Sequence, residues 1–193
     1  MTITSITLTE LLSGDIRTRL AGLLAARATV TISCHDAERL PVAMLAIALD
    51  LAATTGGFLR LEGLSSHALK ALQVIDPERR LAVDDPGRVA PFGERPYLVS
   101  LSADGSLRVA LGKGIGQHPH LTEPASYDWI RGLDASAVEV DLVHIEHLNS
   151  LLVAWLLQLN QSAGPGRCRL VQVGRQATAQ LSQLRLDHLL NIR

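Results

Sequence analysis

The sequence predicts an α/β fold in which two tandem modules each form a mixed β-sheet with helices packed on one face. The strongest indication is an internal repeat, because residues 28–56 align without gaps over residues 136–164. Each copy reads strand, loop, helix, glycine break, strand, polar cap and helix. Composition agrees, since 47% of the residues are hydrophobic but only 3% are aromatic, as in aliphatic helices packed on a sheet. The identical pairs are Val30/Val138, Glu38/Glu146, Leu40/Leu148, Ala46/Ala154, Leu49/Leu157, Leu51/Leu159 and Gly56/Gly164.

The predicted domain boundaries are a first module at residues 1–85, a linker at 86–96 and a second module at 97–193. The linker is rich in proline, glycine and charge, a composition that sustains neither helix nor sheet. With a small gap the repeat continues beyond its first block, pairing Arg60-Leu61 with Arg169-Leu170. Because Leu and Ala are frequent throughout the chain, two unrelated αβ units are the alternative to a true repeat.

The first module is predicted to begin with a short strand, followed by an amphipathic segment that starts at Ser13 or Asp15. Pro41 fits the first turn of the main repeat helix, which is apolar on most sides and should be largely buried. Ser65 and Ser66 cap a further helix. The predicted strands are residues 3–8, 28–33, 58–61 and 79–83, and the two best-defined helices are residues 42–53 and 67–75.

The second module is predicted to begin with a β-hairpin around the turn Ala103-Asp104-Gly105. An irregular loop at 112–124 and a short helix at 125–133 lead to the second copy of the repeat. The predicted strands are residues 97–102, 106–111, 137–142 and 169–173, and the repeat helices are residues 149–161 and 177–190.

Bulk properties argue against several functions. A net charge of -1 gives no basic surface for nucleic acid or an anionic membrane, and few aromatic residues are available to stack on bases. No apolar run reaches the roughly 18–20 residues that span a bilayer, and residues 1–15 lack the features of a signal peptide. Cys34 and Cys168 do not make a disulfide framework. We therefore expect a cytoplasmic protein without direct membrane insertion.

A set of motifs in the second half occurs in a characteristic order. A strand ending in Asp141-Leu142 is followed by a loop, by the helix-opening residues Asn149-Ser150-Leu151-Leu152, by a strand at 169–173 and by a last segment at 184–192. This set resembles the STAS domain, the fold of anti-sigma-factor antagonists and of the cytoplasmic ends of sulfate transporters. The resemblance covers essentially residues 97–193, and the first half shares it through the repeat, as a degenerate copy.

The resemblance implies regulation by protein–protein interaction with an ATP-binding partner, either an anti-sigma kinase-type factor or an ABC transporter ATPase. In STAS domains that switch by phosphorylation, the acceptor hydroxyl lies where this chain has Leu151 and, in the first half, Ala43. Neither residue has a hydroxyl group, so we expect the usual phospho-switch to be absent. Ser150 is the remaining candidate phosphorylation site. The alternative for Asn149 and Ser150 is a plain helix N-cap, worth about 1 kcal/mol.

Other polar clusters give weaker signals. His118 and His120 could form half of a metal site, but with only Glu123 nearby we interpret them as exposed loop residues. His144 and His147 flank Glu146 before the second repeat helix, where structural or partner-facing roles are favoured. Residues 112–116 are glycine-rich but lack the spacing of a phosphate-binding loop. Trp129 and Trp155 are expected to be core residues.

The sequence therefore predicts a non-catalytic regulatory protein that docks on a protein partner, with no metal or cofactor and with homodimer formation left open. The predicted partner-binding residues are Asn149, Ser150, Leu151, His144 and Glu146. One alternative is a small-ligand sensor that binds lipid or nucleotide between the modules, with residues 112–124 as a lid. An accessory subunit of an ABC transporter ATPase is another, and an enzyme is the least favoured class.

Overall fold

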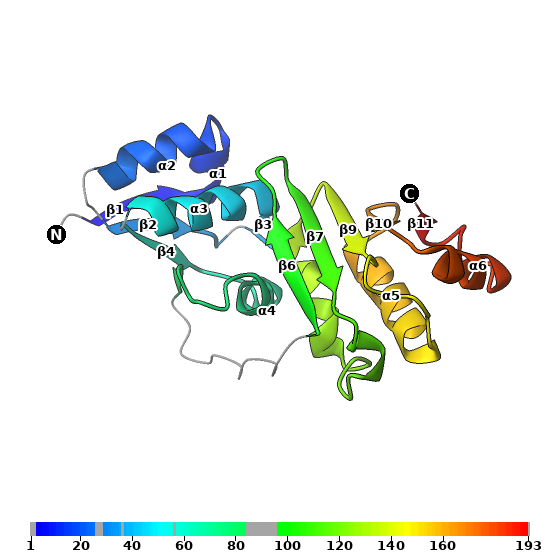
Figure 1. The fold of residues 1–193 in the computed structure, drawn as a ribbon. Helices are drawn as coiled ribbons and strands as arrows, with labels where there is room; N and C mark the ends of the chain where they lie inside the picture. Colours follow the sequence, from blue (N-terminus) through cyan, green and yellow to red (C-terminus); the bar gives the residue numbers. More distant parts are fainter. Residues whose placement is uncertain (1–2, 26–28, 36, 56, 84–95, 193) are drawn as a thin grey trace.

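The computed structural model describes residues 3–25, 29–35, 37–55, 57–83 and 96–192, and it confirms the α/β fold. The chain forms two main sheets, one in each half, which lie side by side along an elongated molecule (Figure 1). Of the predicted linker at 86–96, only Pro96 lies within the described residues.

The first sheet has the strand order β1-β2-β4-β5. Its four described strands all run parallel, which differs from the mixed sheet that we expected in this half. Parallel neighbours need a crossover connection, and helices supply it here. The strands are β1 (Ile3–Thr7), β2 (Thr29–Ser33), β4 (Phe58–Glu62) and β5 (Ala82–Val83), and the helices are α1 (Leu8–Leu12), α2 (Ile16–Ala25), α3 (Val42–Thr55) and α4 (Ser66–Ile75).

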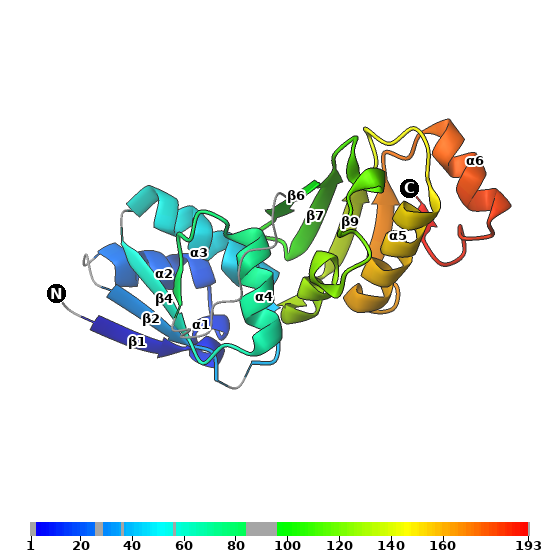
Figure 2. The ribbon, with the colours of Figure 1, turned by 90° about the horizontal axis from the view of Figure 1, so that it is seen from below.

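The second sheet has the order β11-β10-β9-β7-β6 and is mixed, because β6 and β7 form the predicted antiparallel hairpin. Leu107, Val109 and Leu111 of β7 are buried on the helical side, whereas Arg108 points to the other, open face. Figure 2 shows α5 on one side of this sheet. The elements are β6 (Tyr97–Leu101), β7 (Ser106–Leu111), β9 (Ala137–Asp141), α5 (Ser150–Ala163), β10 (Cys168–Val171), α6 (Arg175–Gln183) and β11 (Asn191–Ile192), with short 3-10 turns η1 (Ile115–Gln117), η2 (Pro124–Ser126) and η3 (Asp128–Gly132).

The repeat reappears in the strand registers. Val30 of β2 pairs with Leu59 of β4, and its aligned partner Val138 of β9 pairs with Cys168 of β10. At the next interface, Arg60 pairs with Ala82 in the first sheet, and Arg169 pairs with Asn191 in the second. Strands β1, β2, β4 and β5 therefore correspond to β7, β9, β10 and β11, with the same order and direction, while β6 is an addition of the second half.

The two halves are joined by a small parallel pairing. β3 (Leu40–Pro41) precedes α3 and pairs with β8 (Leu133–Asp134), which follows η3. Beside it α4 packs closely on η3, since a Cβ added at Gly132 would lie 2.1 Å from the carbonyl oxygen of His67. Figure 2 shows α4 alongside this junction. Only glycine allows the two backbones to approach this closely.

An aromatic cluster fills the core beneath the second sheet. Trp129 and Trp155 are each 1% exposed, which confirms their predicted core positions. The Tyr97 ring lies 5.5 Å from the Trp155 ring and 6.3 Å from the Trp129 ring, between centroids. Both indole N–H groups donate to the carbonyl oxygen of Ser126, so the buried polar atoms of the cluster are paired.

Two local predictions differ from the structure, and three short strands were not predicted. The segment expected to be a helix at 125–133 forms the two 3-10 turns η2 and η3. The strands β3, β8 and β11 have two residues each, which is too short for a sequence pattern to predict them. The last repeat helix was expected at 177–190 but ends at Gln183. Arg185 takes a left-handed conformation with φ 55°, and the Leu186 N–H donates to the carbonyl of Leu181, which closes a Schellman-type C-terminus without glycine.

Candidate functional site

The start of α5 is held in place by Asn149. Its side-chain Oδ1 accepts from the Leu152 N–H at 2.9 Å, which is the N-cap bond that the sequence allowed for. Its Nδ2 donates to the carbonyl oxygen of Gly116 at 2.6 Å. The Asn149 side chain therefore ties the helix to the loop after β7, and its role is positioning.

The loop between β9 and α5 is fixed at both ends. Asp141 accepts the Val143 N–H at 2.9 Å through one carboxylate oxygen and Arg108 at 2.6 Å through the other. This hydrogen bond and the Asp141 charge raise the pKa of Arg108. At the far end, the Leu148 N–H donates to Oε1 of Gln180 on α6 at 2.8 Å. The loop is therefore held in place by hydrogen bonds at both ends.

The outward side chains of this segment form what we call the docking surface, made of Val143, His144, Glu146, His147, Ser150 and Leu151. Val143 is 54% exposed and Leu151 is 43% exposed. Between them Ile145 and Leu148 point inward and are buried. All five residues predicted to bind a partner are therefore exposed within one continuous segment of the chain, and the Asn149 side chain also holds the helix start. Val143, and the supports Gly116 and Gln180, were not predicted, because contacts this distant in sequence leave no local pattern.

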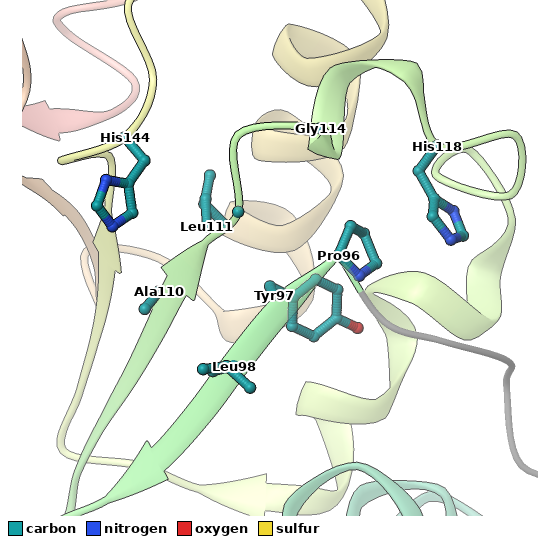
Figure 3. Close-up of a pocket in the computed structure, with 9 residues that line it drawn as sticks. Pro96, Tyr97, Leu98, Ala110, Leu111, Gly114, His118 and His144 are labelled. Atoms are coloured by element: carbon teal, nitrogen blue, oxygen red, sulfur yellow. The ribbon is translucent and has the colours of Figure 1, made fainter.

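A pocket of about 500 Å³ lies next to the docking surface and shares His144 with it. Figure 3 shows the pocket at the end of the β6–β7 hairpin, with His144 and His118 on opposite sides. Its described lining residues are Pro96, at the end of the predicted linker, and residues of the second half, so they do not place this pocket between the modules, where the ligand-sensor alternative placed one. Part of the proposed lid, at Gly112, Gly114 and His118, forms its wall instead.

The remaining candidates show ordinary structural roles. The exposed His120 lies 2.7 Å from Glu123, between Nδ1 and Oε1, and the described residues hold no group of three or more potential metal ligands. In the glycine-rich loop, the Gly112 N–H donates to the carbonyl of Pro96, and only the three-residue η1 follows. Burial raises the pKa of the Cys34 thiol to about 11 and that of Cys168 to about 12, so neither is a reactive thiolate at neutral pH.

Comparisons with protein-family models, curated proteins and solved structures find no match. The STAS resemblance therefore stays a prediction that rests on the order of the motifs. Among the described residues, no helix is both long enough and apolar enough to cross a membrane.

Proposed function

We propose that this chain is a non-catalytic regulatory protein that binds a protein partner through the docking surface at the start of α5. The observation that carries the proposal is Leu151, an apolar side chain 43% exposed in the first turn of a helix whose entry is fixed by hydrogen bonds. Exposure of Leu151 and of the nearby Val143 has no benefit for folding, whereas burial of apolar side chains by a partner is favourable.

The STAS resemblance supports an ATP-binding partner, either an anti-sigma kinase-type factor or an ABC transporter ATPase, in the cytoplasm. Glu146, His144 and His147 add exposed polar side chains to the two exposed apolar ones in this segment. Protein interfaces likewise combine apolar and polar side chains.

The proposal can be tested with a photo-crosslinking amino acid at position 151, expressed in the native host and analysed by mass spectrometry. Position 12 is the matched control, because Leu12 is 41% exposed and lies in the other half. We expect an ATP-binding protein to crosslink at position 151 and not at position 12. Equal crosslinking at both positions would exclude this docking surface.

Leu151→Asp should abolish that interaction and change the free energy of unfolding by less than about 0.5 kcal/mol, as at other surface positions. Leu12→Asp should leave the interaction intact. If Leu151→Asp lowers the melting temperature by several degrees, the side chain supports the fold and the docking surface is misplaced.

We further propose that the docking surface works without phosphorylation at the usual acceptor position. Ser150, the exposed first residue of α5, is the remaining candidate. A phosphate there would add a charge of about -1.5 to -2 at a helix N-terminus, which the fold tolerates well. Intact-mass analysis of protein from its native host should show no phosphate, and a stoichiometric phosphate on Ser150 would overturn constitutive docking.

A further inference from the structure

Strand β1 forms an edge of the first sheet and is its outermost strand in Figure 2. Among the described residues it pairs only with β2. The described neighbours of residues 84–95 are Val83, in the strand at the opposite edge of this sheet, and Pro96, directly before β6. One side of β1 is therefore unpaired within the described chain, and such an edge is a template for another strand.

The backbone groups on this side follow from a hydrogen bond at the end of β1. The Thr7 N–H donates to the carboxylate of Glu10 at 3.0 Å, so it points away from β2. Successive residues of a strand direct their N–H and C=O groups to opposite sides. Ile3 and Ser5 therefore also direct both groups away from β2, where a further strand could bind them.

The equivalent edge of the second half already carries a strand. Ser106 of β7 corresponds to Ile3 of β1, because their parallel partners on β9 and β2 are aligned in the repeat. The carbonyl of Ser106 accepts the Ser102 N–H at 2.9 Å, and β6 continues this antiparallel pairing along β7. The module therefore accepts an antiparallel neighbour on the side that β1 leaves open.

The other edges of the two main sheets are protected by short length, by proline or by a covering segment, as is common at sheet edges. β5 and β11 have two residues each, and β6 follows Pro96 and contacts α3 and α4. β1 has five residues without a proline or a charge, and Ile3 at its start is 72% exposed. Among the described edges, β1 is the most open to strand addition.

The strand β1 complements a second copy of itself. When two copies meet antiparallel about a two-fold axis at Thr4, Ile3 of each copy lies opposite Ser5 of the other. Both residues then exchange N–H and C=O bonds, as in the hydrogen-bonded pair of an antiparallel sheet. The two Thr4 side chains lie opposite each other, which is a favourable cross-strand pair. We propose that two copies of this chain associate through β1 and join their first sheets into one continuous sheet.

The proposal can be tested by sedimentation velocity and amide exchange of the full chain over a concentration series. We expect a monomer–dimer equilibrium with a Kd below about 100 µM. As the dimer forms, the amide protons of Ile3 and Ser5 should become protected, whereas the Thr7 amide, already bonded to Glu10, should not change. A chain that stays monomeric at about 500 µM, or a dimer without this protection, would overturn the proposal.

Two substitutions at one position separate the backbone from the side chain. Ser5→Pro removes an outward N–H and no bond to β2, and an edge strand tolerates proline when its nitrogen faces solvent. The Kd should rise at least about tenfold, while circular dichroism confirms the fold. Ser5→Ala is the matched control, because it keeps the N–H and should dimerise like the wild type. If folded Ser5→Pro dimerises as well as Ser5→Ala, β1 is not the interface; if it does not fold, the amide protection decides.

This interface is independent of the docking proposal. Leu151 lies in the other half, so Leu151→Asp should leave the dimer unchanged, and Ser5→Pro should leave partner binding unchanged. Loss of the dimer in Leu151→Asp would place the interface at the docking surface and overturn pairing through β1.

Discussion

The starts of α3 and α5 occupy equivalent positions beside the two sheets, but they differ in how far the rest of the chain covers them. At the first, Val42 is 0% exposed and Ala43 is half-buried, because β8 pairs with the residues before α3 and the β6–β7 hairpin packs near the helix. At the second, Ser150 and Leu151 are exposed, and no described segment pairs with the residues before α5 in this way.

The α3 start is covered because two segments of the second half, β8 and the β6–β7 hairpin, pack against it. The helix α3 is buried on most sides, as its sequence predicted, because it has α2 on one flank and the second half on another. The helix α5 buries only its inner side. Of two equivalent helix starts, one is covered by the other half and the other stays exposed.

The largest effect is expected from Trp155→Ala. Trp155 belongs to the aromatic cluster under β6, a part of the second half without a counterpart in the first, where Ile47 holds the aligned position. Loss of a buried Trp should lower the free energy of unfolding by about 3–5 kcal/mol. Chemical denaturation measures it, with the exposed Gln158→Ala as a control that should change little. A loss below about 1 kcal/mol would show that the cluster does not support the second half.

Gly132→Ala tests the junction between the halves. The new Cβ would meet the His67 carbonyl at 2.1 Å and the Ala68 nitrogen at 2.7 Å, so α4 and η3 must separate, at a cost of about 1–3 kcal/mol. Hydrogen exchange should rise at the α3 start and not at the α5 start. Gly22→Ala is the matched control, because nothing lies within 4 Å of its added Cβ, and this helical position should gain about 0.5–1 kcal/mol. Equal effects at both glycines would contradict the close junction.

Exchanging the residues at the aligned positions 42 and 150 compares the two helix starts directly. Val42→Ser removes buried methyl groups and buries a hydroxyl, so it should cost about 1–2 kcal/mol. Ser150→Val changes an exposed position and should stay within about 0.5 kcal/mol of the wild type. Thermal unfolding of both variants decides whether the first helix start is covered in solution. Similar changes in the free energy of unfolding for the two variants would mean that the α3 start is exposed in solution.

Ionisation of the two cysteine thiols should not change the free energy of unfolding at neutral pH. The folded-state pKa values of about 11 for Cys34 and about 12 for Cys168 exceed the ordinary value, so the folded chain retains protons that the unfolded chain releases. Stability should therefore fall as the pH rises above about 9. At pH 7.5, native thiol labelling should be on the order of a thousandfold slower than in denaturant, and Cys34 and Cys168 then report how often each half opens. Rapid labelling of one thiol would identify its half as loosely packed.

The sequence allowed the α/β class, the helix starts and most strands to be predicted, because periodicity and capping residues such as Asn149 and Ser65 act locally. It did not reveal the junction, since β3 and β8 are two residues each and the approach at Gly132 depends on α4 of the other half. His144, Glu146, Ser150 and Leu151 were selected from the sequence by their place at a helix start, and their role in binding stays a prediction. Their supports, Gly116 and Gln180, and the pocket depend on contacts about thirty residues apart in sequence, and no short pattern encodes these.

The junction between the halves has a consequence for assembly, because it joins two different surfaces. One is the start of α3 in the first half, and the other is the segment of η3 and β8 in the second half. Contacts of this head-to-tail kind close into a ring when the rotation between units allows it, and otherwise extend into filaments. Among the described residues, the first half has no segment equivalent to η3 and β8. Within the described residues its sheet ends at β1, and α1 and α2 occupy the connection that carries η3 and β8 in the second unit. Within the described residues, the first half therefore offers no surface on which the α5 start of a second copy could repeat this junction.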